Sequence, residues 1–228
     1  MRLDYPCGPE DGQTARRAAA AMSENPLRGA QFLLSTPNPK GLPADIGAEI
    51  AFAGRSNAGK SSALNALTGV HGLARTSRTP GRTQHLVAFS LPDGRRLIDL
   101  PGYGYAKVPE AVRDHWRDAL EGYLGARHSL RGLALVMDIR HPLTRFDSQM
   151  LDFCAAHGVP CHILLTKADK LGRGACAQAL LSVRKRLESA SGVLSVQIFS
   201  AKAGTGLDEA RGALAALLSH RPRPSAAH

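Results

Sequence analysis

Short apolar runs alternate with longer segments of helical periodicity through most of this chain. Six of these runs are typical of strands and cover residues 49–54, 85–91, 95–100, 133–138, 161–166 and 195–200. Helical patterns follow Lys60 and extend over about 110–124, 144–157, 174–190 and 207–219. Strands that alternate with helices form parallel sheets covered on both faces. The chain therefore predicts an α/β fold with a mostly parallel six-stranded sheet and helices on both faces.

The connection between the second and third strand patterns is an exception. Pro92, Asp93 and Gly94 separate the two patterns there, which is typical of a hairpin turn. We therefore expect one strand to run antiparallel at the edge of the sheet.

The two ends of the chain lack the alternating pattern. Residues 1–28 contain early Gly and Pro residues and a short Ala-rich stretch, and we expect them to form a flexible extension. Residues 29–220 are expected to form one domain, and residues 221–228 a mobile basic tail. The chain has no run of 18 apolar residues and no apolar N-terminal stretch, so we expect a cytoplasmic protein without a membrane span.

A phosphate-binding pattern, G-x-x-x-x-G-K-[ST], joins the first predicted strand to the first predicted helix. It consists of Gly54, Arg55, Ser56, Asn57, Ala58, Gly59, Lys60 and Ser61. The glycines let main-chain N–H groups face a phosphate chain, Lys60 can reach the β and γ phosphates, and the Ser61 hydroxyl can join a Mg²⁺ shell. The strand before the motif and the helix after it are the context that the motif requires, so we expect binding of a nucleoside triphosphate.

The residues that follow two later strands indicate guanine as the base. Thr166, Lys167, Ala168 and Asp169 lie at the carboxyl end of a buried strand, where α/β proteins bind ligands. A carboxylate at position 169 can accept from both N1–H and the 2-amino group of guanine, whereas adenine would leave it unpaired. The sequence FSAKAGTG at 199–206 fits a loop that closes over the base, with the main-chain N–H of Ala201 near O6.

A third group of residues fits the γ-phosphate and its metal ion. Asp99 ends a strand, as the Mg²⁺-linked carboxylate of a P-loop enzyme does, and the Gly102 amide can bond the γ-phosphate. The polar segment 75–84, which contains Gly and Pro, can become ordered when nucleotide binds. Thr83 in this segment is the candidate that would complete the Mg²⁺ shell.

The chain resembles the EngB (YihA/YsxC) family of bacterial GTPases, of the TrmE-Era-EngA-EngB-Septin-like group, in GRSNAGKSS, TPGRTQ, DLPGYGYAKV, TKADK and FSAKAG. The resemblance covers about residues 32–218 and implies a Ras-like P-loop G domain that slowly hydrolyses GTP with Mg²⁺. It also implies a role in assembly of the large ribosomal subunit and in normal cell division and septation. The nucleotide contacts that it implies are residues 54–61, Gly81, Arg82, Thr83, Gln84, His85, Asp99, Leu100, Pro101, Gly102, residues 166–169, Phe199, Ser200 and Ala201, with Mg²⁺ on Ser61 and Thr83.

The residue after the D-L-P-G sequence bears on hydrolysis. Ras-type enzymes have there a glutamine that orients the attacking water, whereas this chain has Tyr103. We therefore expect a low intrinsic rate, with Lys60, Thr83 and Asn57 as the catalytic candidates. In related GTPases an asparagine at the position of Asn57 helps to hold K⁺ beside the phosphates. The alternative is an asparagine that only shapes the loop.

The net charge indicates a polyanionic partner. The chain carries 29 Lys and Arg residues against 19 Asp and Glu, a formal charge of +10. We expect contact with ribosomal RNA and the large-subunit precursor, no membrane contact, and a monomer. The candidate contact residues, each also compatible with an ordinary solvated charge, are Arg75, Arg78, Arg82, Arg95, Arg96, Arg184, Lys185, Arg186, Arg221 and Arg223.

Other interpretations share some of these residues. One is a GTP-dependent partner of division proteins without direct RNA contact, and another is a nucleotide-using enzyme such as a kinase, for which no additional substrate-holding domain is evident. Cys154, His157, Cys161 and His162 also suggest zinc ligands. A strand would place Cys161 and His162 on opposite faces, so at most three ligands could converge, and we expect ordinary burial of reduced thiols.

Overall fold

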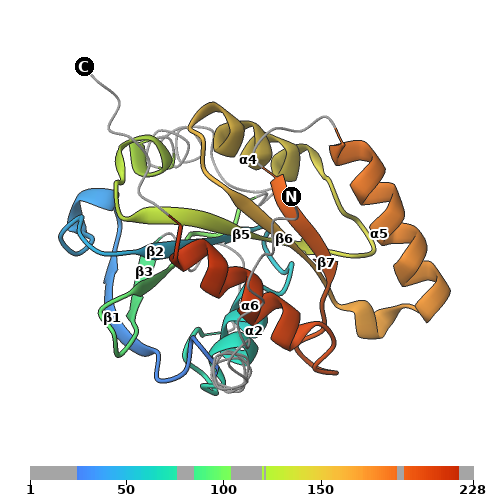
Figure 1. The fold of residues 1–228 in the computed structure, drawn as a ribbon, viewed down its shortest axis with the longest axis horizontal. Coiled ribbons are helices and arrows are strands. Elements are labelled where there is room, and N and C mark those ends of the chain that lie inside the picture. The colour runs from blue at the N-terminus through green and yellow to red at the C-terminus, as the bar shows by residue number, and fades with distance from the viewer. Residues whose placement is uncertain (1–24, 76–84, 104–119, 121, 189–192, 221–228) are drawn as a thin grey trace, which may run out of the picture.

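A sheet of seven strands forms the centre of the part of the chain that the computed structural model describes, which is residues 25–75, 85–103, 120, 122–188 and 193–220 (Figure 1). The strands are β1 (Gln31–Thr36), β2 (Glu49–Gly54), β3 (Leu86–Ser90), β4 (Arg96–Asp99), β5 (Leu130–Asp138), β6 (Cys161–Thr166) and β7 (Val193–Ile198). Their order across the sheet is β1-β3-β4-β2-β5-β6-β7.

The predicted α/β fold is confirmed, with one correction to the number of strands. All six predicted strands are present, and β4, β2, β5, β6 and β7 pair in parallel. The seventh strand, β1, pairs antiparallel with β3 and lies outside it, so β3 is next to the edge strand. The pattern missed β1 because Phe32 and Leu33, although apolar, are 61% and 45% exposed and mark no buried face.

The predicted hairpin joins β3 to β4. These two strands pair antiparallel, and the turn is closed by hydrogen bonds from Leu91 N to Arg95 O (2.8 Å) and from Gly94 N to Leu91 O (3.0 Å). Gly94 has φ 79°, a left-handed conformation that glycine adopts without a steric cost. The hairpin returns the chain so that β4 lies beside β2, which brings Asp99 opposite Phe52.

Helices cover both faces of the sheet, as predicted. Residues of α2 (Lys60–Thr68) and α6 (Leu207–Leu218) pack with Ile50 and Phe52 on one face. Residues of α4 (Arg145–Ala156), α5 (Arg173–Leu187) and the helical stretch 122–126 pack with Ala51 and Ala53 on the other. Successive residues of β2 thus enter two separate cores, as the period of a strand requires, and Figure 1 shows the two helical layers.

The start of α4 is marked by a capping signal in the sequence. Thr144 and Asp147 form a capping box, in which the Asp147 side chain accepts from the main chain and hydroxyl of Thr144. This fixes the helix start one residue after the predicted 144. The helix predicted at 110–124 lies mostly outside the described residues, which include only 120 and 122–124 of it.

The described part of the N-terminal region belongs to the core. Leu27 is fully buried, and the Asn25 side chain donates to Leu67 O (2.9 Å) at the end of α2. Residues 1–24 and 221–228 lie outside the described residues, so the flexible extension and the mobile tail stay predictions. Among the described helices, none has the length and apolar character to cross a bilayer.

Candidate functional site

The loop between β2 and α2 is built around two glycines. A Cβ at Gly54 would lie 2.6 Å from Val136 O, so only glycine lets β2 and β5 approach this closely where the loop begins. Gly59 has φ 101° and is the N-cap of α2, which allows the chain to turn directly into the helix. Asn57 has φ 61°, a conformation that asparagine tolerates better than most residues. The resulting curve presents the N-terminus of α2, a site that favours an anion.

Lys60 and Asp99 lie together beside this loop. Lys60 begins α2 and Asp99 ends β4, and their side chains form an ion pair in which both are about nine-tenths buried. Parallel pairing of β2 with β4 produces the contact, because it brings the ends of the two strands to the same edge of the sheet. Ser61, the next residue of α2, is half-buried at this edge. The site thus combines a cation, a carboxylate and a hydroxyl.

Residues 101–103 lie against the loop. A Cβ at Gly102 would be 3.5 Å from Cα and N of Ser56, and the Ser56 N–H donates to Tyr103 O (2.8 Å). The Tyr103 ring is buried and its hydroxyl donates to Asp147 Oδ1 (2.9 Å). Burial and the neighbouring charge of Asp147 raise the pKa of Tyr103 well above its ordinary value. The phenol is therefore committed to the start of α4 and does not act as an acid or base near neutral pH.

The segment 166–169 packs against the same loop from the other side. Thr166 donates through its hydroxyl to Ala58 O and to Met137 O, and Lys167 donates to Asn57 O. Asp169 accepts from the Ser200 hydroxyl (2.7 Å), and this hydrogen bond lowers the pKa of Asp169 below its ordinary value. Asp169 is therefore ionised at neutral pH and oriented by a buried serine.

Residues 199–206 form a loop that is fixed to segment 166–169. Phe199 is fully buried, its N–H donates to Leu165 O (2.8 Å), and its carbonyl accepts from Ala168 N (3.2 Å). Ser200 closes the loop by donating from N to Thr205 O (3.0 Å), while its hydroxyl accepts from Ala203 N (3.1 Å). Ala201 follows with its side chain partly buried. The predicted base-contacting residues from two distant segments are thus neighbours.

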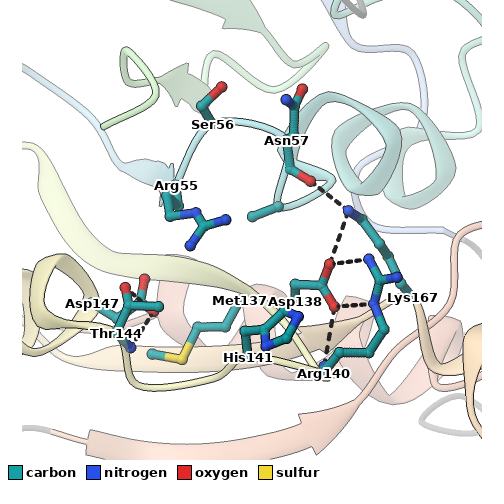
Figure 2. A pocket seen from close by; sticks show the side chains of 11 residues that line it. Arg55, Ser56, Asn57, Met137, Asp138, Arg140, His141, Thr144, Asp147 and Lys167 are labelled. Atoms are coloured by element: carbon teal, nitrogen blue, oxygen red, sulfur yellow. Dashed lines mark hydrogen bonds and ion pairs between the residues drawn. The ribbon is translucent and has the colours of Figure 1, made fainter. Parts of the chain in front are cut away.

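A cavity of about 200 Å³ opens beside residues 55–58 (Figure 2). Three of the lining side chains are cationic and two are carboxylates. The lining residues are Arg55, Ser56, Asn57, Ala58, Met137, Asp138, Arg140, His141, Thr144, Asp147 and Lys167. Figure 2 shows the Asn57 side chain turned away from this cavity, while the Asn57 carbonyl meets Lys167. The motifs assign no role to Asp138 or Arg140. One signal was available, because Asp138 ends a buried strand, as Asp99 does.

The structure brings most of the predicted site residues to one edge of the sheet. These are residues 54–61, Asp99, Leu100, Pro101, Gly102, residues 166–169, Phe199, Ser200 and Ala201. His85 is exposed and its ring faces the Ser35 hydroxyl (Nδ1 to Oγ 3.2 Å). Gly81, Arg82, Thr83 and Gln84 lie outside the described residues, so the second predicted Mg²⁺ ligand is untested.

One predicted RNA contact is wrong, and the zinc alternative gains no support. Arg96 is 8% exposed and its guanidinium pairs with the buried Glu49, so it cannot serve as a surface contact. His162 is buried and both ring nitrogens face protein partners, Ser195 Oγ (2.6 Å) and Gln197 Oε1 (3.0 Å). No cluster of three or more potential metal-binding His, Cys, Asp or Glu side chains occurs in the described part of the chain.

Sequence comparisons match this chain to a family and to curated relatives. The family model described as 50S ribosome-binding GTPase matches residues 49–167. A Stenotrophomonas maltophilia (strain K279a) protein, "Probable GTP-binding protein EngB", is 56% identical over 189 residues, 82% of this chain and 94% of the relative. A protein of the same name from Xanthomonas oryzae pv. oryzae (strain PXO99A) is 53% identical over 203 residues, 89% of this chain and 98% of the relative.

Solved structures share the fold. The crystal structure of a probable GTP-binding protein engB aligns with a TM-score of 0.61 at 22% identity, covering 75% of this chain and 98% of that one. Era in complex with MgGDPNP and nucleotides 1506–1542 of 16S ribosomal RNA aligns with a TM-score of 0.58 at 20% identity, covering 79% and 59%. At these identities the likeness concerns the arrangement of strands and helices.

Proposed function

This chain belongs to the EngB family of GTP-binding proteins, within the 50S ribosome-binding GTPases, and from that premise we propose that it is a GTP-driven switch in assembly of the large ribosomal subunit. The carrying observation is that Lys60, the loop before it and Asp169 lie at one edge of the sheet. Two segments more than 100 residues apart thereby face the same nucleotide, one at its phosphates and the other at its base.

In the proposed complex, residues 54–61 surround the phosphates and Asp169 reads the base. Lys60 exchanges its pairing with Asp99 for contacts to the β and γ phosphates. Asp169, ionised and held by Ser200, accepts from the N1–H and 2-amino group of guanine. Adenine has no matching donors and would leave this carboxylate unpaired, which explains selectivity for guanine.

The donor set beside Lys60 suits Mg²⁺. Magnesium prefers oxygen ligands and binds through few protein groups together with phosphates. Ser61 and Asp99 provide a hydroxyl and a carboxylate at this position, and we assign direct ligation to Ser61 and Thr83. When bound, the ion neutralises charge on the β and γ phosphate oxygens.

Intrinsic hydrolysis is proposed to be slow. Tyr103 holds the position that carries the water-orienting glutamine in Ras-type enzymes, and its hydroxyl is engaged by Asp147. Charge neutralisation is then the main source of catalysis, with Lys60, Thr83 and a K⁺ ion held by Asn57 as the contributors. The Asn57 side chain is exposed and points away from the cavity in Figure 2.

Turnover in KCl and in NaCl tests the potassium proposal. We expect faster hydrolysis in KCl and loss of this difference in Asn57→Ala. Equal rates in both salts, with Asn57→Ala unaffected, would remove K⁺ from the mechanism. GTP binding is measured in parallel, so that a failure to bind is not mistaken for a failure to respond to potassium.

An exposed basic surface supports contact with ribosomal RNA. Arg184, Lys185 and Arg186 are exposed near the end of α5, and their charges agree with the excess of 10 positive charges in the chain. Arg95 is a weaker candidate because it pairs with Asp93 and donates to Pro26 O. Association with ribosomal particles should therefore weaken steeply as salt rises. Defects in cell division and septation would follow from a shortage of ribosomes.

Sedimentation of a lysate through a sucrose gradient tests the cellular role. With a non-hydrolysable GTP analogue we expect the protein to comigrate with precursors of the large subunit, and with GDP to remain at the top. Comigration in neither state, or in both equally, would contradict a nucleotide-controlled role in assembly. The first of these outcomes would favour a division partner without RNA contact.

A further inference from the structure

Asp138 occupies a central position at the edge of the sheet where the proposed nucleotide site lies. It ends β5, which lies between β2 and β6, so the residue stands between the loop after β2 and segment 166–169. In the pairing of β5 with β6, Asp138 is opposite Thr166. The Asp138 side chain is 15% exposed, which means that its charge is mostly surrounded by protein.

The Asp138 carboxylate pairs with two cationic side chains. Oδ1 accepts from Arg140 N (3.1 Å) and Arg140 Nε (2.9 Å). Oδ2 accepts from Arg140 Nη2 (2.6 Å) and forms an ion pair with Lys167 Nζ (3.0 Å). The bidentate contact with Arg140 fixes the plane of the carboxylate, and the free edge of Oδ2 is thereby directed at Lys167 (Figure 2).

Lys167 connects this carboxylate to the loop after β2. Its ammonium lies on Asp138 and also donates to the main-chain carbonyl of Asn57. Lys167 has φ 61°, a left-handed conformation that is uncommon for a residue with a side chain and that needs support from its surroundings. One ammonium thus joins the ends of β5 and β6 to the phosphate loop.

We propose that Asp138 is a positioning residue for the guanine nucleotide, which acts by holding the Lys167 ammonium on the Asn57 carbonyl. This proposal rests on the function assigned above to residues 54–61 and 166–169. Held in this way, the base-reading segment and the phosphate loop keep a fixed separation before the nucleotide arrives. Without the carboxylate, Lys167 gains alternative rotamers in solvent, and binding must order it again.

The electrostatics of Asp138 agree with this role. Burial alone would raise the pKa of Asp138, but the hydrogen bonds from Arg140 and Lys167 outweigh burial and hold the pKa far below its ordinary value. The carboxylate therefore stays ionised at neutral pH. Its hold on Lys167 does not vary near neutral pH.

The release of a fluorescent N-methylanthraniloyl derivative of GDP, followed by stopped flow on the full chain, tests the proposal. We expect Asp138→Asn, which keeps the shape and removes the charge, to release the nucleotide about tenfold faster. The control is Asp152→Asn, which changes an exposed carboxylate of α4 and should release at the wild-type rate. Thermal unfolding without nucleotide establishes that each variant is folded.

A double-mutant cycle separates positioning from a general structural effect. In a Lys167→Met background, Asp138→Asn should cause no further acceleration, because the group through which Asp138 acts is already absent. Arg140→Gln gives a second route if Asp138→Asn does not fold, since the Arg140 side chain is 41% exposed. We expect it to accelerate release about threefold, again only when Lys167 is present.

The outcomes distinguish this proposal from the function on which it rests. If the wild-type protein does not bind the GDP derivative, the proposed function fails. If it binds, and Asp138→Asn and Arg140→Gln both release at the wild-type rate, the positioning role is overturned and the proposed function stands. An acceleration that persists unchanged in the Lys167→Met background would also overturn it, because Asp138 would then act by another route.

Discussion

The two ends of β2 both carry charged clusters, but the clusters are satisfied in different ways. At the amino end, Glu49 is fully buried and its two oxygens accept from Arg96 Nε (3.2 Å), Tyr123 Oη (3.1 Å) and Arg127 (2.8 and 3.2 Å). Burial and the charge of Glu49 raise the pKa of Tyr123, so the phenol remains a donor. Every charge in this cluster has its partner within the protein.

At the carboxyl end the corresponding groups are paired in a way that a ligand can replace. Lys60 pairs with Asp99, and Asp169 accepts only one side-chain hydrogen bond among those described, from Ser200. Asp169 is exposed, whereas Lys60 and Asp99 are about nine-tenths buried. The comparison indicates that the amino-end cluster serves stability alone, whereas the carboxyl-end cluster also serves binding. Variants at the two ends should therefore differ in their effect on GTP affinity.

Removal of the Glu49 charge should have the largest effect. Glu49→Gln leaves Arg96 and Arg127, whose side chains are each 10% exposed, without their main counter-charge. We expect a loss of about 3–5 kcal/mol in the free energy of unfolding, measured with urea, and little change in GTP affinity of the folded protein. The matched control is Asp93→Asn, which breaks the exposed pair with Arg95 and should cost less than about 1 kcal/mol. A Glu49→Gln protein as stable as wild type would contradict the stability role.

Removal of the Lys60 ammonium should act on binding. We expect Lys60→Ala to weaken GTP binding by about 100-fold, because charge-assisted contacts to two phosphates are lost. The free energy of unfolding should also fall, because Asp99, whose side chain is 9% exposed, is left without its counter-charge. Titration calorimetry measures the affinity, and Lys40→Ala, an exposed residue of the short helix η1 (Pro39–Gly41), is the control. Unaltered GTP affinity would show that the carboxyl-end cluster does not bind phosphate.

The smallest expected effect is the pH dependence of stability that arises from His162, a buried residue near the start of β6. Burial lowers the pKa of His162, although its hydrogen bond with Gln197 opposes this. The unfolded chain takes up a proton below about pH 6.5, while the folded protein resists it until lower pH. Stability should therefore fall as pH decreases from 6.5 towards the folded pKa, by at most about 1.4 kcal/mol per pH unit. His162→Gln should flatten this slope in urea unfolding, and an unchanged slope would exclude His162 as its source.

Sequence patterns predicted the parts of the fold in which local and global signals agree. The strand, glycine loop and helix around residues 49–68, the hairpin turn at 92–94 and the capped helix at 144–157 each carry their own local chemistry. The patterns failed where a side chain takes its role from a distant partner. Arg96 reads as a surface cation until Glu49, 47 positions earlier, is placed beside it.

The same limit applies to the candidate site. Asp138 reads as an ordinary residue at the end of a strand, because its partner Lys167 directly follows the neighbouring strand β6. The edge strand β1 was missed for a related reason, since Phe32 and Leu33 are exposed and its pairing with β3 contains a register shift. Local motifs thus indicated the ligand, whereas the groups that position those motifs required the fold.

Calorimetric titration of the pure protein with GTP and with ATP, both in the presence of MgCl₂, tests the central claim most directly. GTP should bind, ATP should bind about 10⁴-fold more weakly, and Asp169→Asn should lose the preference, because one carboxylate held by Ser200 reads the purine. Equal retention of ATP and GTP, or retention of neither, would contradict the account.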